Sequence, residues 1–126
     1  MPVTPSKSVL VIDDSRVARM LIHRIILDIH PDWVILEAAC GQEGLELARS
    51  KVPDYITMDF NMPDMNGVEA AEQILLSTPK AVIVLFTANV QAKTQSKTDN
   101  LGIGFVSKPV TNDAVLQALA FFASKS

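Results

Sequence analysis

The 126-residue chain contains a single cysteine, Cys40. One thiol excludes an internal disulfide and also a cysteine-based zinc site, which needs several ligands at close spacing. We therefore expect Cys40 to be a small, half-buried side chain without chemistry of its own.

Long apolar runs are also missing. The longest, residues 81–86, is far shorter than the roughly 18 residues that a membrane-spanning helix requires. The first eight residues are polar and contain proline and serine, so they do not resemble a secretory signal. The sequence therefore predicts a cytoplasmic protein with no membrane partner and a flexible N-terminal lead-in over residues 1–7.

Positive charge is not in excess. The 11 basic and 14 acidic side chains give a formal net charge of -3. This balance provides no broad basic surface for a phosphate backbone, so nucleic acid is not an expected partner. Proteins and small anions are the expected ones.

Two kinds of segment alternate along the chain. Short runs rich in β-branched residues predict strands over residues 8–12, 34–38, 55–58, 81–86 and 104–106, each buried on both faces. Helical spacing predicts helices over residues 15–29, 42–50, 68–77, 91–100 and 112–124, with Ser15 capping the first and Gly41 preceding the second. The alternation predicts one α/β domain over residues 8–126, with a parallel sheet and helices on both faces. The fourth helix, residues 91–100, is polar and is expected to be mobile.

Polar side chains follow several of the predicted strands. Asp13 and Asp14 come after the first strand, Asp59 ends the third, Thr87 follows the fourth, and Lys108 follows the fifth. The carboxyl ends of parallel strands open onto one edge of the sheet, where ligands bind. We therefore expect these side chains to converge.

Three converging carboxylates repel one another and need a positive partner. Lys108 supplies one positive charge, and a divalent cation supplies the two that remain. Oxygen ligands favour Mg²⁺; Mn²⁺ can substitute and zinc is disfavoured.

A carboxylate supported by a metal and a lysine suits phosphoryl transfer, because both cations neutralise charge on the phosphoryl oxygens. Asp59 is the best nucleophile candidate because it arrives alone from a central strand, whereas Asp13 and Asp14 form a pair suited to the metal. Thr87 is placed to hydrogen-bond a phosphoryl oxygen.

Over residues 8–124 the chain resembles the receiver domains of response regulators in two-component signalling, in particular the stand-alone CheY-like type. Four motifs carry the resemblance, in the family's order and at similar intervals: VLVIDDS from Val9, MDFNMPDMNG from Met58, VLFTA from Val84 and VSKP from Val106. The resemblance implies a flavodoxin-like (CheY-like) doubly wound (βα)5 fold with strand order 2-1-3-4-5. It also implies that Asp59 accepts a phosphoryl group from a histidine kinase or a histidine phosphotransfer protein. Such a domain catalyses only its own phosphorylation and dephosphorylation and is not otherwise an enzyme.

The resemblance also implies the roles of the other site residues. Asp14, Asp59 and the backbone carbonyl of Asn61 would bind Mg²⁺, with Asp13 acting through water. Lys108 would contact the phosphoryl group, and its bond to Pro109 is expected to be cis.

Signal output in the family couples a threonine, here Thr87, to an aromatic ring, here Phe105. The ring turns inward when the hydroxyl moves, which remodels the surface of helix four, strand five and helix five for an unidentified downstream protein. Phe105 replaces the frequent tyrosine, so contacts through a ring hydroxyl are absent. Asn61 and Asn89 flank the path of the hydrolytic water, and neither can act as a general base, so we expect them to tune the phosphoryl lifetime. We expect a monomer, with phosphorylation-dependent dimerisation left open.

Three alternative functions share parts of this pattern. An aspartyl-phosphate phosphatase commonly has an acid two residues after the nucleophile, where this chain has Asn61. A flavin carrier needs a Ser/Thr/Gly-rich loop after the first strand, which this sequence lacks. A receiver domain cut from a larger regulator fits the motifs equally well.

Charged residues of the first predicted helix have open roles. Arg16, Arg19 and Arg24 form a solvated face, or Arg16 and Arg19 help to dock the phosphodonor. His23 has no further ligands nearby and is expected to be an ordinary, partly packed histidine.

Overall fold

The computed structural model describes residues 6–88 and 101–125. Its five strands form one parallel sheet in the order β2-β1-β3-β4-β5, which confirms the expected fold class. The strands are β1 (Ser8–Ile12), β2 (Val34–Ala38), β3 (Tyr55–Asp59), β4 (Val82–Thr87) and β5 (Gly104–Ser107). The helices are α1 (Arg16–Ile29), α2 (Gly41–Lys51), α3 (Gly67–Ser77) and α5 (Asn112–Lys125). The predicted helix over residues 91–100, residues 1–5 of the lead-in and Asn89 lie outside the described residues.

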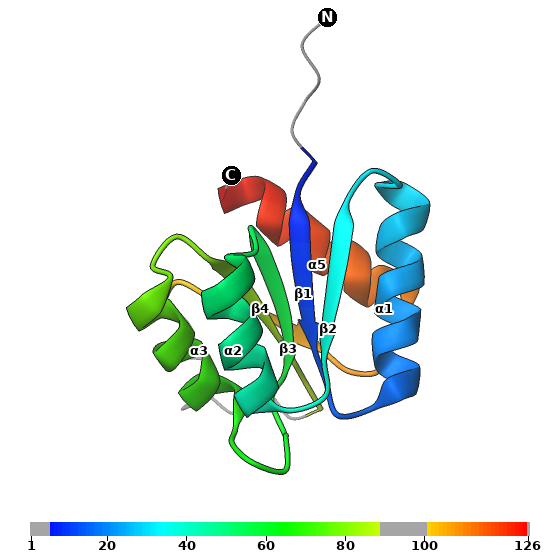
Figure 1. Cartoon of the computed structure of the whole chain (residues 1–126). Helices are drawn as coiled ribbons and strands as arrows, with labels where there is room; N and C mark the ends of the chain where they lie inside the picture. The colour runs from blue at the N-terminus through cyan, green and yellow to red at the C-terminus, as the bar shows by residue number, and fades with distance from the viewer. Residues whose placement is uncertain (1–5, 89–100, 126) are drawn as a thin grey trace, which may run out of the picture.

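Helices cover both faces of the sheet (Figure 1). Side chains alternate along each strand, so Leu10 and Ile12 of β1 pack toward α2 and α3, whereas Val9 and Val11 pack toward α1 and α5. Each face therefore has its own buried apolar layer. The sheet between them is a rigid base for whatever lies at its edge.

Strand β2 differs from the prediction that all strands are buried on both faces. Val34 is exposed, and Ile35, Leu36 and Glu37 are only half-buried. The reason is that β2 is an edge strand, paired only with β1. One charged side chain, Glu37, is therefore tolerated within this strand.

Three strands extend one residue beyond their predicted ends. The sheet register pairs Asp59 with Phe86, and Thr87 with Ser107. The apolar runs end earlier than the backbone ladder because polar side chains can occupy the last ladder positions. Asp59 and Thr87 are thus held by the sheet and do not lie in loops.

The start of α2 also differs from expectation. Gly41, predicted to precede the helix, is its first residue, and Cys40 occupies the N-cap without a side-chain cap. Instead, the two carboxylate oxygens of Asp64 accept the backbone N–H groups of Gly41 and Gln42 at 3.0 and 2.8 Å. These N–H groups hold the pKa of Asp64 below its ordinary value. Asp64 thereby ties the loop after β3 to α2.

Gly67, the first residue of α3, approaches the end of β3 closely. A Cβ atom at this position would lie 3.0 Å from both the Asp59 carbonyl oxygen and Phe60 Cα. The Gly67 N–H donates to the Phe60 carbonyl at 2.7 Å. Glycine therefore lets α3 begin directly against the strand end that carries Asp59.

Ser15 caps α1 as predicted, because its hydroxyl accepts the Ala18 N–H at 3.2 Å.

Within residues 6–88 and 101–125, no helix has the length and apolarity needed to cross a membrane.

Candidate functional site

Three carboxylates meet at the carboxyl edge of the sheet. One oxygen from each of Asp13, Asp14 and Asp59 lies within 4.8 Å of the others. They converge because β1 and β3 are paired neighbours, so their ends adjoin. Asp13 and Asp59 are 2% and 3% exposed, while Asp14 is exposed to solvent. The cluster is therefore buried on one side and open on the other.

Lys108 reaches this cluster from the loop after β5. Its Nζ lies 2.7 Å from Asp59 Oδ1, and its backbone N–H donates to the Thr87 carbonyl at 2.8 Å. The Lys108–Pro109 peptide bond is cis. The end of β4 thus holds the lysine backbone while its ammonium group faces Asp59.

Burial sets the electrostatics of the buried pair. Removal from water raises the pKa of Asp59 above its ordinary value, and the nearby Lys108 opposes that rise. Burial likewise raises the pKa of Asp13, against the effect of the Ser15 N–H, which donates to Asp13 Oδ1 at 2.8 Å. One ammonium group does not balance three carboxylates, so the site holds excess negative charge.

A divalent cation fits this donor set. Among the described residues, Asp59 Oδ1 is buried without a hydrogen bond of good geometry, although Lys108 lies within ion-pair distance of it. An oxygen that lacks a well-directed donor is a suitable metal ligand. The exposed side at Asp14 leaves room for water, which Mg²⁺ usually retains. The acidic cluster is thus of the kind that can hold Mg²⁺.

Replacing Asp59 with asparagine is expected to stabilise the metal-free protein at pH 7 by on the order of 1 kcal/mol. The pKa of Asp59 is higher in the folded protein than in the unfolded chain, so the folded protein binds more protons at pH values between the two pKa values. The destabilisation of the folded protein by Asp59 therefore grows as the pH rises above the ordinary pKa of 3.8. Urea unfolding with EDTA from pH 4 to 8 should show the variant's advantage shrinking toward pH 4. Equal stability of the two proteins at pH 7 would contradict this account.

Of the other predicted site residues, those that the structure describes lie on β4, on β5 and in the loop after β3. Thr87 is buried at the end of β4, and Phe105 is half-buried on β5, opposite Leu85. Since Leu85 and Thr87 are two residues apart on one strand, Thr87 and Phe105 lie on the same face of the sheet. Asn61 is exposed in the loop after β3, where it forms an isolated bridge with Asn66. Its backbone N–H, like Lys108, opposes the rise that burial causes in the pKa of Asp59.

Three residues that shape this edge have contacts that the sequence did not predict: Asp64, Gly67 and Arg19. Asp64 and Gly67 lie inside the MDFNMPDMNG motif, but only the fold reveals that they meet α2 and β3. The solvated-face interpretation is wrong for Arg19, whose side chain is only 15% exposed and donates to the Asp13 carbonyl. Arg16 and Arg24 are exposed.

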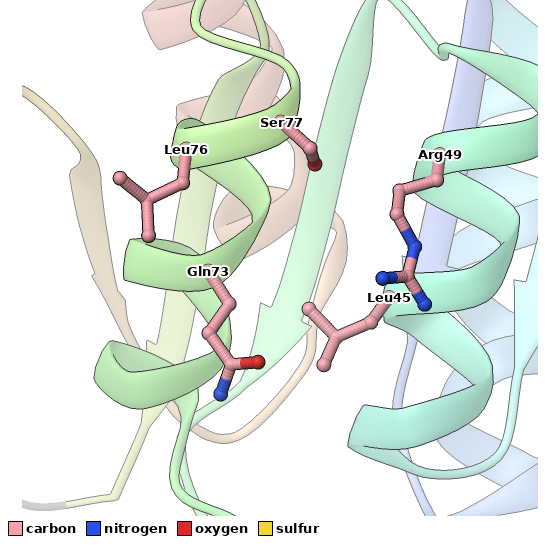
Figure 2. Close-up of a pocket in the computed structure, with 5 residues that line it drawn as sticks. All are labelled: Leu45, Arg49, Gln73, Leu76 and Ser77. Atoms are coloured by element: carbon pink, nitrogen blue, oxygen red, sulfur yellow. The ribbon is translucent and has the colours of Figure 1, made fainter.

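A cavity lies away from the acidic edge. It opens between α2 and α3, with a volume of about 290 Å³, and is lined by Leu45, Arg49, Gln73, Leu76 and Ser77 (Figure 2). None of these side chains belongs to the carboxylate cluster. This cavity is therefore not the reaction site.

A doubly wound sheet in this strand order, with acidic residues and a lysine at its carboxyl edge, defines the receiver class of signalling domain. The chain belongs to the response regulator receiver domain family, whose family model matches residues 9–120. Phosphotransfer is the standard chemistry of this family.

Relatives with this domain differ in length. Protein CcdB of Bacillus subtilis is 35% identical over 89% of this chain and 93% of its own length. Response regulator UvrY of Escherichia coli is 32% identical over 89% of this chain, and response regulator GacA of Pseudomonas aeruginosa is 33% identical over 88%. This chain spans 52% of UvrY and of GacA, about half their length.

Solved structures agree on the fold. The response regulator domain of Thermotoga maritima CheB superposes with a TM-score of 0.82 and 28% identity, covering 96% of both chains. Vibrio cholerae chemotaxis protein CheY4 superposes with a TM-score of 0.82 and 25% identity, covering 92% of this chain and 98% of its own.

Proposed function

We propose that this chain is a cytoplasmic phosphorylation switch in which Asp59 accepts a phosphoryl group from a phosphohistidine donor in a Mg²⁺-dependent reaction. The observation that carries the proposal is the 2.7 Å contact between Lys108 Nζ and Asp59 Oδ1 inside a cluster of three carboxylates. Family membership supplies the general chemistry, and this cluster supplies the residues.

In the transfer, a carboxylate oxygen of Asp59 attacks phosphorus in line with the donor's P–N bond. That bond breaks, the donor imidazole leaves with its electron pair, and an aspartyl phosphate forms. Lys108 stabilises the charge of the incoming phosphoryl oxygens, since it already lies beside Asp59. Mg²⁺, when bound, would neutralise further charge on the same oxygens.

Some of the site residues are proposed to bind the metal directly, and one is proposed to bind it through water. Asp14, Asp59 and the backbone carbonyl of Asn61 are the proposed direct ligands. Asp13 is proposed to act through water, because one of its oxygens already accepts the Ser15 N–H. Mn²⁺ is expected to replace Mg²⁺, because both prefer oxygen ligands.

Output is proposed to pass through Thr87 and Phe105. Both lie on the same face of the sheet, and Phe105 is half-buried. Its ring is proposed to turn inward when the Thr87 hydroxyl moves toward a phosphoryl group. The affected surface would comprise the predicted helix four, β5 and α5, where a downstream protein binds. Asn61 and Asn89 are proposed to set the lifetime of the phosphoryl group by orienting or blocking water.

The phosphodonor, a histidine kinase or a histidine phosphotransfer protein, is proposed to dock on the start of α1. Val17 and Met20 are 75% and 56% exposed there, a short distance along the chain from Asp14. Exposed apolar side chains gathered beside a reaction site are typical of a protein-docking surface.

Two alternative functions can be distinguished from the proposed one. A receiver within a longer regulator is the alternative proposal, supported by the half-length coverage of UvrY and GacA. An aspartyl-phosphate phosphatase is less favoured, because Asn61 replaces the acid that would protonate a leaving group. Sustained turnover of phosphomonoesters would favour the phosphatase.

The proposal is tested by incubating the protein with acetyl phosphate and Mg²⁺ and measuring its intact mass. We expect one added phosphoryl group that EDTA prevents and hydroxylamine removes, because an acyl phosphate is labile to hydroxylamine. A label that resists hydroxylamine would indicate serine or threonine and would contradict the proposal. With a phosphorylated histidine phosphotransfer protein as donor, Met20→Glu should slow transfer while leaving the acetyl phosphate rate unchanged. Leu76→Glu, a matched change on α3, should affect neither.

A further inference from the structure

Arg19 of α1 links the acidic pair to the edge strand of the sheet. Its Nη1 donates to the backbone carbonyl of Asp13 at 2.7 Å, and its Nε donates to Glu37 Oε1 at 3.1 Å. The side chain is only 15% exposed, so Arg19 is largely buried where it makes these two contacts. One side chain therefore contacts both the end of β1 and the body of β2.

The carbonyl that Arg19 holds belongs to the peptide joining Asp13 to Asp14. On the other side of Asp13, its N–H donates to the Ala38 carbonyl at 3.0 Å. With both flanking peptides hydrogen-bonded, the backbone turn that presents the two carboxylates has little freedom to rotate. The exposed Asp14 side chain depends on this turn for its direction toward Asp59.

Glu37 fixes the orientation of Arg19. It faces α1 from β2, and its second oxygen lies 2.8 Å from Nδ1 of His23, which is one helical turn after Arg19. His23 and Arg19 together hold the pKa of Glu37 below its ordinary value, which keeps the carboxylate charged. A planar guanidinium can use Nε and Nη1 for two partners at a fixed angle, which a lysine cannot do.

We propose that Arg19 is a positioning residue for the metal site: it holds the Asp13–Asp14 peptide in place, and Glu37 with His23 holds Arg19. The inference rests on the proposed function of the acidic cluster. Arg19 makes its contact with the backbone of the metal-binding pair and leaves the carboxylate oxygens free for the ion.

Positioning and simple charge predict opposite results when Arg19 is replaced. The positive charge of Arg19 beside an acidic cluster repels Mg²⁺, so its removal alone would tighten metal binding. Loss of positioning loosens the ligands, and residues that orient metal ligands typically contribute about tenfold or more to metal affinity. The sign of the change therefore separates the two effects.

The test is a Mg²⁺ titration of Arg19→Gln, Arg19→Lys and Glu37→Gln, followed by backbone amide chemical shifts in NMR and by the acetyl phosphate reaction. Arg24→Gln is the matched control, since it removes the same charge from an exposed position on the same helix. We expect half-saturating Mg²⁺ to rise about tenfold in Arg19→Gln. A smaller rise is expected in Arg19→Lys and Glu37→Gln, and none in Arg24→Gln. The rate at saturating Mg²⁺ should change much less than half-saturation.

Mg²⁺ affinity in Arg19→Gln that equals or exceeds that of Arg24→Gln would overturn the inference. If Arg19→Gln does not fold, Glu37→Gln decides the matter: unchanged half-saturation refutes the inference, and a rise supports it. Wild-type protein that neither binds Mg²⁺ nor becomes phosphorylated would instead refute the proposed function itself.

Discussion

Asp59→Asn is expected to remove the hydroxylamine-labile phosphate from the protein entirely, with either acetyl phosphate or a phosphohistidine donor. An amide oxygen is a poor nucleophile, and the neighbouring carboxylates of Asp13 and Asp14 are committed to other contacts or to the metal. The fold itself should persist, since the substitution removes a negative charge that burial disfavours.

Asp54→Asn is the matched control for this experiment. Asp54 lies just before the opposite end of β3, where its carboxylate accepts the Ser8 N–H at 2.9 Å. Its loss should leave the stoichiometry of phosphorylation at one group per chain. Full labelling of Asp59→Asn, measured by intact mass, would show that another residue is the acceptor.

Lys108→Ala is expected to slow phosphorylation by acetyl phosphate about 10²–10³-fold, because a fixed charge beside the reacting oxygens is lost. A second effect has a definite sign. Lys108 opposes the burial that raises the pKa of Asp59, so its removal raises that pKa further. Since Asp59 must be ionised to attack phosphorus, the rising limb of the rate against pH should move to higher pH.

Initial rates measured across pH in wild type and in Lys108→Ala check both effects. Lys51→Ala, which removes an exposed lysine at the end of α2, should match wild type. A Lys108→Ala profile with a lower plateau but an unshifted limb would mean that Lys108 does not influence the ionisation of Asp59.

The convergence of Asp13, Asp14, Asp59, Thr87 and Lys108 was predictable because it follows from topology. Each lies at the carboxyl end of a strand, and parallel strands place those ends along one edge. The fold class was predictable for the same reason, since alternating strand and helix patterns permit few arrangements.

Contacts between remote segments were not predictable in this way. No local pattern shows that Asp64 caps a helix 23 positions away, or that Arg19 bridges Asp13 and Glu37. These contacts depend on side-chain direction and on which strand forms the edge of the sheet. The apolar periodicity of a sequence encodes burial, and it does not encode such partnerships.

The identity of the phosphorylated residue is tested most directly by reducing freshly phosphorylated protein with borohydride and sequencing its peptides by tandem mass spectrometry. Reduction converts an aspartyl phosphate to homoserine. We expect homoserine at position 59 alone, and only in samples phosphorylated with Mg²⁺ present. Unmodified Asp59 together with a modified residue elsewhere would contradict it.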